Sequence, residues 1–284
     1  LVPVRSGDRV KTDRRDAMKL ARFLRSGDLT EIHVPSVATE AMRDLERGRD
    51  DAKRAQRVAR HQLSKFLLRH GHRFEGKTTW KRQHYRWLST QRFEHPAQQR
   101  VLEDYLKTVQ DLDERVAQLT KSIVEFVETW ELKPVVRALQ ALRGIGIISA
   151  VVLAAEVEDF ARFDRATKFM AYTGLVPSEH SSGEARKQGR ITRTGNQHVR
   201  RILVEAAWAY RFRPGLSLAI RRRSQGVAEG VQRIAARAQT RLCARFRRLV
   251  GRGKHGNKVV VAIARELAGF VWAIAREERL IEEA

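Results

Sequence analysis

Two adjacent serines stand in the most basic part of this sequence of 284 residues. Ser181 and Ser182 precede Gly183 in a segment without helical period. A serine hydroxyl is a weak nucleophile at its ordinary pKa, so it needs a base to take its proton and cations to stabilise the charge that grows on a phosphate. His180 and His198 are the candidate bases nearby. Taken alone, the same pattern is also that of an ordinary polar loop.

Lysines and arginines surround the two serines. Residues 181–254 hold 19 of them against three acids, in a chain whose formal net charge is +23. This excess favours a polyanionic partner, because cations that neutralise phosphates release condensed counterions. The candidate contacts are Arg186, Lys187, Arg190, Arg193, Arg200 and Arg201, the triplet Arg221, Arg222 and Arg223, and Arg241, Arg245, Arg247 and Arg248. A solvated basic face is the alternative, and charge does not separate DNA from RNA.

Two carboxylates near the start are spaced for a shared metal ion. Asp13 and Asp16 lie three apart at the start of a predicted helix, so both project from one face toward a hard divalent cation such as Mg²⁺. In the alternative, Asp13 caps the helix and Asp16 is a solvated acid in its first turn, where negative charge is favoured. On spacing alone the alternative is the commoner case.

A glycine turn is a third candidate site. Gly144-Ile145-Gly146 between two apolar segments is similar to the hairpin of helix-hairpin-helix modules, whose exposed backbone amides hold a DNA phosphate. Arg143 is the adjacent cation. A tight turn between helices, without a ligand, fits the pattern equally well.

The hydrophobic pattern predicts a mainly α-helical protein. An amphipathic helix is expected over 13–26, ended by Gly27, and an extended stretch over 31–35. A long helix follows over 37–69, with a weak apolar seam that Arg49 and Gln56 interrupt. Residues 70–96 have no clear period, which predicts short helices or loops at the tip of a hairpin.

A second long helix is predicted from apolar residues that step by three and four, the spacing of a coiled-coil seam. Another helix must cover this seam. Residues 37–69, folding back as an antiparallel arm, are the favoured partner, and the same helix of another subunit is the alternative, which leaves a homo-oligomer through the arm open. The seam residues are Leu102, Tyr105, Val109, Leu112, Val116, Leu119, Ile123, Phe126 and Trp130.

Residues 133–284 are expected to form a compact helical domain, with a bend at Pro214 and Gly215. The single cysteine, Cys243, excludes an internal disulfide and is interpreted as core filling. No apolar run approaches the roughly 18 to 20 residues needed to cross a bilayer, so we expect a cytoplasmic protein without a membrane partner.

Four segments together resemble the bacterial insertion-sequence transposases of the IS110 group. They are KTDRRDAMKLA, LRGIGIISAVVLAAE, RFDRATKFMAYTGLVPSEHSSGEARKQGRITRTGNQHVRRILVEAAW and GNKVVVAIARELAGFVWAI, in that order along the chain. The resemblance implies three parts: the remnant of a RuvC-like DEDD nuclease domain (1–35), a coiled-coil arm (36–132), and a C-terminal transposase domain with a serine nucleophile (133–284).

The resemblance also implies residue roles and partners. Asp13 and Asp16 match the last two acids of DEDD, which would hold Mg²⁺, and Ser182 matches the nucleophile, with Ser181 as the second choice. The implied partners are DNA and a structured guide RNA, the bridge RNA, that pairs with target and donor DNA. DNA strands would be cleaved and exchanged through a serine-phosphate intermediate.

The opening residues read like the interior of a domain, and the other two DEDD acids would lie before Leu1. Two acids on one helical turn cannot enclose two metal ions. We therefore expect this chain alone to bind nucleic acid without recombining DNA. The alternative function is a non-catalytic helix-hairpin-helix protein that binds DNA or RNA.

Overall fold

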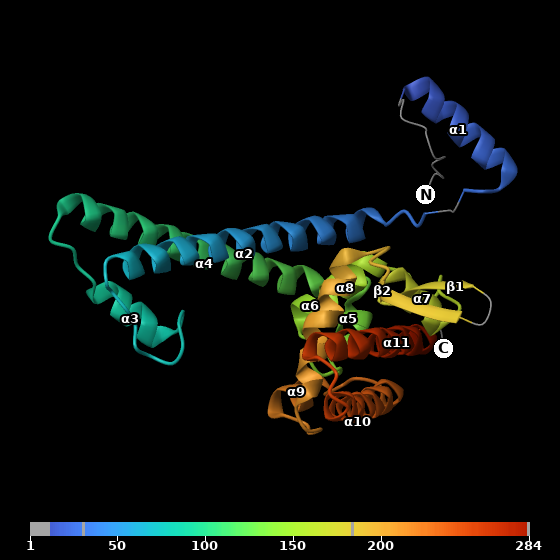
Figure 1. Cartoon of the computed structure of the whole chain (residues 1–284). Coiled ribbons are helices and arrows are strands. Elements are labelled where there is room, and N and C mark those ends of the chain that lie inside the picture. Colours follow the sequence, from blue (N-terminus) through green and yellow to red (C-terminus); the bar gives the residue numbers. More distant parts are fainter. Residues whose placement is uncertain (1–11, 30–31, 183–184, 283–284) are drawn as a thin grey trace. The chain divides into compact units, whose positions relative to one another are not determined.

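The computed structural model describes residues 12–29, 32–182 and 185–282. Helices make up most of these residues, and the one sheet among them is a two-stranded hairpin (Figure 1). This confirms the prediction of a mainly α-helical protein. The contacts divide the chain into two compact units, Leu1–Ser36 and Val37–Ala284. The division into three domains at residues 35 and 132 stays a prediction.

Helix α1 (Asp13–Ser26) is the described helix of the first unit. The Thr12 side chain caps its first turn by accepting a hydrogen bond from the Arg15 amide at 3.4 Å. Gly27 ends it with a φ of 72°, a left-handed conformation that glycine adopts without strain. Both ends agree with the sequence prediction. Residues 32–35, the described part of the predicted extended stretch, form neither helix nor strand.

An antiparallel arm opens the second unit. Helix α2 (Val37–Arg69) packs along helix α4 (Pro96–Val127), and α3 (Arg82–Thr90) lies between them in sequence, at the far end of the arm (Figure 1). Four of the five buried α4 residues repeat every seven positions: Leu102, Val109, Val116 and Ile123. The arm is thus intramolecular, and the covering helix is the predicted one.

The polar interruptions of the α2 seam have partners across the arm. Gln56 is buried and donates to Asp113 Oδ1 at 2.6 Å, and Arg60 pairs with the same oxygen at 2.7 Å. The Arg49 guanidinium donates to Thr120 Oγ1 at 2.7 Å. A buried polar group costs little free energy once it is hydrogen-bonded, so these positions do not disrupt the packing of α2 on α4.

The remaining helices build a second, larger core. They are α5 (Lys133–Leu139), α6 (Ile147–Val157), α7 (Ala166–Tyr172), α8 (Gln197–Ala207), the 3₁₀ helix η1 (Trp208–Arg211), α9 (Leu218–Arg223), α10 (Glu229–Gly251) and α11 (Gly256–Glu282). Helix α11 contacts α5, α7, α8 and α10, and α6 is buried along almost all of its length. Cys243 is fully buried in this core, as predicted.

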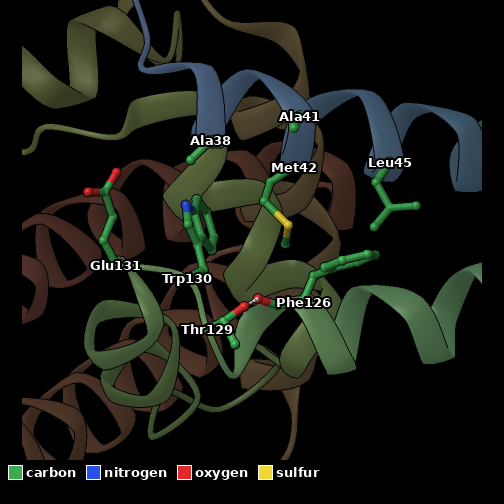
Figure 2. A pocket seen from close by; sticks show the side chains of 8 residues that line it. All are labelled: Ala38, Ala41, Met42, Leu45, Phe126, Thr129, Trp130 and Glu131. Atoms are coloured by element: carbon green, nitrogen blue, oxygen red, sulfur yellow. Dashed lines mark hydrogen bonds between the residues drawn. The ribbon is translucent and has the colours of Figure 1, made fainter.

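An apolar cavity of about 480 Å³ lies where the arm meets this core. Figure 2 shows Met42 and Leu45 of α2 facing Phe126 of α4 and Trp130 across it. The Phe126 side chain is 58% exposed, whereas Trp130 is buried. The last two residues of the predicted seam thus differ: Trp130 fills the base of the arm, and Phe126 lines an open hollow.

Two elements were not predicted from the sequence. Strands β1 (Pro177–Ser182) and β2 (Ala185–Ile191) form the antiparallel hairpin in a segment that was expected to be irregular. Helix α9 carries the arginine triplet and is capped by Ser217, whose hydroxyl accepts a hydrogen bond from the Ile220 amide at 3.3 Å.

Candidate active site

The two serines lie at the end of strand β1. Ser182 is its last residue, and its side chain is exposed. In the register of the hairpin, Ser182 pairs with Ala185 and Ser181 with Arg186. The side chains of Ser181 and Arg186, like those of His180 and Lys187, lie outside the described part of the structure. Ser182 is therefore exposed at the end of a strand.

Two glycines fix the base of the hairpin. Gly174 and Gly195 have φ angles of 66° and 74°, and a Cβ atom on Gly195 would overlap the carbonyl oxygen of Tyr172. The amide of Arg193 donates to the Gly174 carbonyl at 3.1 Å, which joins the two chain segments below the strands. Only glycine can adopt these positive φ angles and let the neighbouring backbone approach so closely. The two glycines therefore determine where the hairpin starts.

Asn196 connects the hairpin to the helix that follows it. Its side-chain oxygen accepts hydrogen bonds from the amides of His198 and Val199, at 2.9 and 3.0 Å, and so caps α8. Its Nδ2 donates to Glu156 Oε2 at 2.7 Å. His198 is half-buried in the first turn of α8. One residue thus positions both the end of the hairpin and the start of α8.

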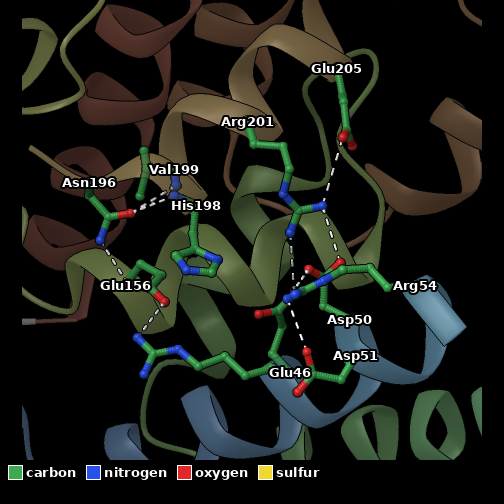
Figure 3. Close-up of polar contacts among 11 residues, drawn as sticks. Glu46, Asp50, Asp51, Arg54, Glu156, Asn196, His198, Val199, Arg201 and Glu205 are labelled. Atoms are coloured by element: carbon green, nitrogen blue, oxygen red, sulfur yellow. Dashed lines mark hydrogen bonds and ion pairs between the residues drawn. The ribbon is translucent and has the colours of Figure 1, made fainter. Parts of the chain in front are cut away.

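Glu156 is the buried acid at the centre of this arrangement, with a side chain only 5% exposed. Besides Asn196, its carboxylate binds Arg47 of α2 at 3.1 Å (Figure 3). Arg43 of α2 donates to the neighbouring Ala155 carbonyl at 2.6 Å. The arm, helix α6 and the capped end of α8 are therefore joined through polar contacts, which we call the joint.

A second ion-pair group extends the joint along α2 (Figure 3). Arg201 of α8 lies 3.7 Å from the buried Glu46 carboxylate and 3.4 Å from Asp50, and it also pairs with Glu205. Burial raises the pKa of Glu46, the Asp50 carboxylate raises it further, and the Arg201 guanidinium opposes them. Glu46 and Glu156 were not among the candidate residues of the sequence, because their partners across the joint lie 40 or more positions away.

The predicted phosphate-contacting cations differ in their surroundings. Arg190 and Arg193 are exposed, and Arg193 has a φ of 57°. Arg200 donates to the carbonyls of Thr173 and Thr194, at 2.9 and 3.2 Å, and its pKa is lowered by burial and by the charge of Arg193. Arg201 is engaged by the acids of the joint. Nucleic-acid contact by these residues stays a prediction.

The glycine turn packs against the end of α8. Gly144 has a φ of 85°, and a Cβ atom there would lie 2.5 Å from the carbonyl oxygen of Ala206. Gly146 precedes the first residue of α6. Arg143 donates to the Arg213 carbonyl at 2.8 Å and Arg223 to the Ile145 carbonyl at 3.0 Å. Close packing alone accounts for Gly144, and phosphate binding at this turn stays a prediction.

The other arginines divide into exposed and paired side chains. Arg221 and Arg222 are exposed on α9. Arg241 and Arg245 of α10 both pair with Glu266 of α11, Arg245 at 2.8 Å. Of the four predicted α10 cations, Arg247 and Arg248 are thus the exposed ones without a described ion pair.

Asp13 and Asp16 both lie in the first turn of α1, Asp13 exposed and Asp16 half-buried. Thr12 is the N-cap, so the alternative in which Asp13 caps the helix is wrong. Within the described ranges no three His, Cys, Asp or Glu side chains come together to hold an ion. Two carboxylates on one turn fit part of a ligand set and do not enclose a metal.

Comparison with known proteins identifies the family. Residues 136–219 match a family model described as the transposase IS116/IS110/IS902 family, and residues 4–71 match a transposase model of the DEDD IS110 type. A Sinorhizobium fredii protein with a transposase designation, y4qE, is 48% identical over 279 residues, which are 98% of this chain and 68% of that protein. The chain belongs to the IS110/IS116 family of transposases.

Two further relatives are transposases of named insertion sequences. The transposase for IS1533 of Leptospira borgpetersenii is 32% identical over 251 residues, which are 87% of this chain and 72% of the relative. The transposase for IS1328 of Yersinia enterocolitica is 26% identical over 275 residues, 94% of this chain and 73% of the relative. The protein is thus an insertion-sequence transposase, an enzyme that recombines DNA.

The two matched family segments contain the two candidate chemical groups of the transposase. Asp13 and Asp16 lie in the segment that matches the DEDD model, which implies a divalent-metal site, and Ser181 and Ser182 lie in the other segment. The distal part of the arm falls between the two segments. None of the described helices of this transposase has an apolar stretch long enough to cross a membrane.

Proposed function

We propose that this transposase cleaves and exchanges DNA strands with Ser182 as its nucleophile. The observation that carries the proposal is the exposed position of Ser182 at the end of β1, on a hairpin whose base is fixed by Gly174 and Gly195. A nucleophile must reach a phosphate in a bulky duplex and still be held in place, and a surface hairpin with a rigid base meets both needs.

The proposed reaction transfers a DNA phosphate to the serine oxygen. The Ser182 hydroxyl loses its proton to a base, His180 or His198, and its oxygen forms a bond to a DNA phosphorus. The bond from that phosphorus to the 3′ oxygen breaks, and the leaving oxygen takes up a proton as a 3′ hydroxyl. The 5′ phosphate stays on the serine until the 3′ hydroxyl of another strand attacks it in the reverse step. The number of phosphodiester-type bonds is conserved throughout.

Arginines beside the hairpin support this chemistry. Arg193 is exposed and close enough to Arg200 for its charge to lower the pKa of that guanidinium. Two neighbouring cations without a described carboxylate between them repel each other, and a phosphate bound there would relieve the repulsion. Cations fixed beside the reacting group also stabilise the charge that develops on the phosphate in the transition state.

Asp13 and Asp16 are proposed as two of the ligands of the divalent-metal site, with Mg²⁺ as the ion. A bound ion would stabilise negative charge on a phosphate oxygen. Both carboxylates project from the first turn of α1 and accept this role without rearrangement of the helix. We expect cleavage to need more acidic ligands than these two, so this chain alone should bind DNA without cleaving it.

The implied guide RNA completes the proposal. The basic segment around the serines suits two polyanions, and base pairing with an RNA would supply sequence recognition that arginine-phosphate contacts lack. We propose that the target is chosen by this RNA and that the protein holds both nucleic acids through their backbones. Omission of the RNA should then abolish cleavage at a defined target while leaving weak, salt-sensitive DNA binding.

The decisive experiment compares Ser182→Ala with Ser181→Ala. An assembly in which the acidic ligands of the metal site are complete, with magnesium, guide RNA and both DNA partners, is incubated with DNA labelled on the fragment that would carry the 5′ phosphate, and the covalent protein-DNA adduct is measured after denaturation. We expect Ser182→Ala to lose the adduct with DNA binding intact, and Ser181→Ala to keep it. Loss in Ser181→Ala alone would move the nucleophile to Ser181. An adduct that persists in both variants would refute a serine nucleophile.

A further inference from the structure

The far end of the arm carries a second concentration of positive charge. Residues 65–100, which we call the head, contain nine lysines and arginines against two acids. Together with the basic segment 181–254, the head accounts for the whole net charge of the chain, so all other residues together are neutral. The nine cations are Lys65, Arg69, Arg73, Lys77, Lys81, Arg82, Arg86, Arg92 and Arg100.

All nine of these cations are exposed. The body of the arm is different, because both surface lysines of α4 there pair with acids one helical turn away: Lys107 with Asp111 at 3.1 Å and Lys121 with Glu125 at 3.6 Å. A basic surface kept only for solubility would show the same mixture of signs along its whole length. The charge is therefore segregated toward the head rather than spread over the arm.

The head has its own hydrophobic core, which makes it a folded surface rather than a loose loop. Phe66, Leu67 and Leu88 are buried in a cluster separate from the core of the C-terminal helices. Phe66 packs on Phe93 with ring centroids 5.1 Å apart, and Trp87 stacks on the buried His84 at 5.6 Å. Ordering this many groups at the end of an arm costs conformational entropy, which a passive connection between two helices would not require.

The aromatic rings of the head pack against one another or against an arginine. The Trp80 ring faces the Arg60 guanidinium, 4.9 Å from its centroid, and packs edge-on against His84. Proteins that bind single strands stack bases on open aromatic faces. Here the exposed side chains include the nine cations, among them Arg82 and Arg86, four apart on α3 opposite the buried His84 and Leu88. This surface fits the two phosphate backbones of a duplex.

We propose that the head binds double-stranded DNA through its phosphates, without sequence preference, at a distance from the serine hairpin. The proposal rests on the membership of a family that acts on DNA, and it does not depend on Ser182 as the nucleophile. Helix α2, at 33 residues, spans about 50 Å, so the head contacts DNA well away from the hairpin. Its function is to hold a length of duplex beyond the reacting site.

The test removes equal charge from the head and from the body of the arm in the intact chain. The head variant carries Lys77→Gln, Lys81→Gln and Arg86→Gln, and the control carries Lys107→Gln, Arg115→Gln and Lys121→Gln. Binding to a duplex of arbitrary sequence is measured by fluorescence anisotropy over a series of salt concentrations. Each phosphate contact contributes about 0.9 to the slope of log K against log salt, so the head variant should lower that slope by up to about 2.7.

The outcomes separate the proposal from its alternatives. A smaller slope in the head variant with an unchanged slope in the control supports it. Equal changes in both variants would show a general charge effect and overturn it, as would no change in either. A loss confined to duplex RNA would overturn the assignment to DNA. Circular dichroism before each titration checks that the helices are intact, and the adduct assay with Ser182 tests the nucleophile separately.

Discussion

Replacement of Glu156 by glutamine tests whether the joint holds the hairpin and the arm together. The carboxylate accepts hydrogen bonds from Arg47 at 3.1 Å and from Asn196 at 2.7 Å, in a position that is 5% exposed. Glutamine has nearly the same shape but keeps a single acceptor oxygen. Its new amide donor would face one of the two existing donors, so one hydrogen bond is lost and one buried donor is left without a partner.

The magnitude follows from these two losses. A hydrogen bond to a charged group contributes about 1.5 to 3 kcal/mol, and an unsatisfied buried donor costs about 1 to 3 kcal/mol. The Arg47 side chain is 44% exposed, so solvent screens its attraction and the lower end of each range applies. We expect Glu156→Gln to lower the free energy of unfolding by about 2.5 kcal/mol.

The assay is chemical denaturation, followed by both tryptophan fluorescence and circular dichroism so that coincident transitions test for two-state behaviour. Glu205→Gln is the control, because this carboxylate is 62% exposed and pairs with Arg201 at 3.7 Å; we expect it to change stability by less than about 0.5 kcal/mol. If Glu156→Gln loses no more than Glu205→Gln, the joint does not stabilise the protein and the reasoning fails.

Two more changes test the hairpin base and the buried acid of the arm. Gly195→Ala should lower the free energy of unfolding by more than about 2 kcal/mol, because the backbone there is left-handed and a Cβ atom would overlap the Tyr172 carbonyl. The control is Gly48→Ala, in open space on α2, which should raise the free energy of unfolding by up to about 1 kcal/mol. Equal thermal midpoints for the two variants would contradict this. The raised pKa of Glu46 means that the folded state binds a proton at this carboxyl group more tightly, so its contribution to stability should be fully present below about pH 4.5 and decline as the pH rises through the raised pKa. Glu46→Gln should abolish that decline in denaturation curves measured across this pH range, and an unchanged pH dependence would count against a desolvated Glu46.

The helices of the arm were predictable from sequence because their signals are local. Apolar residues at heptad spacing marked α4, and the bounds of α2 agree with the predicted range of 37–69. Thr12 and Gly27 delimit α1 by capping, a short-range interaction. The polar positions Arg49 and Gln56 were visible as interruptions, but their partners Thr120 and Asp113 lie on another helix.

Neither the hairpin nor the joint was predictable from the sequence, and the physical reason differs between the two. Strands β1 and β2 contain few β-branched or apolar residues and no alternation, so their pairing depends on the glycine-fixed base rather than on a buried face. The joint depends on contacts between residues such as Arg47 and Glu156, which are 109 positions apart. The residue types of the candidate site could be recognised in the sequence, whereas the contacts that position them could be identified only in the folded structure.

The separation of the two hydrophobic clusters gives the arm the properties of an adjustable spacer. Ala52 and Val116 are buried between the clusters without belonging to either, in the stretch where Gln56 binds Asp113. A volume change in one cluster is therefore not transmitted to the other. Adding one heptad to both helices would lengthen the arm by about 10 Å and leave both ends intact. A change in arm length alone would thus change the distance between the head and the hairpin.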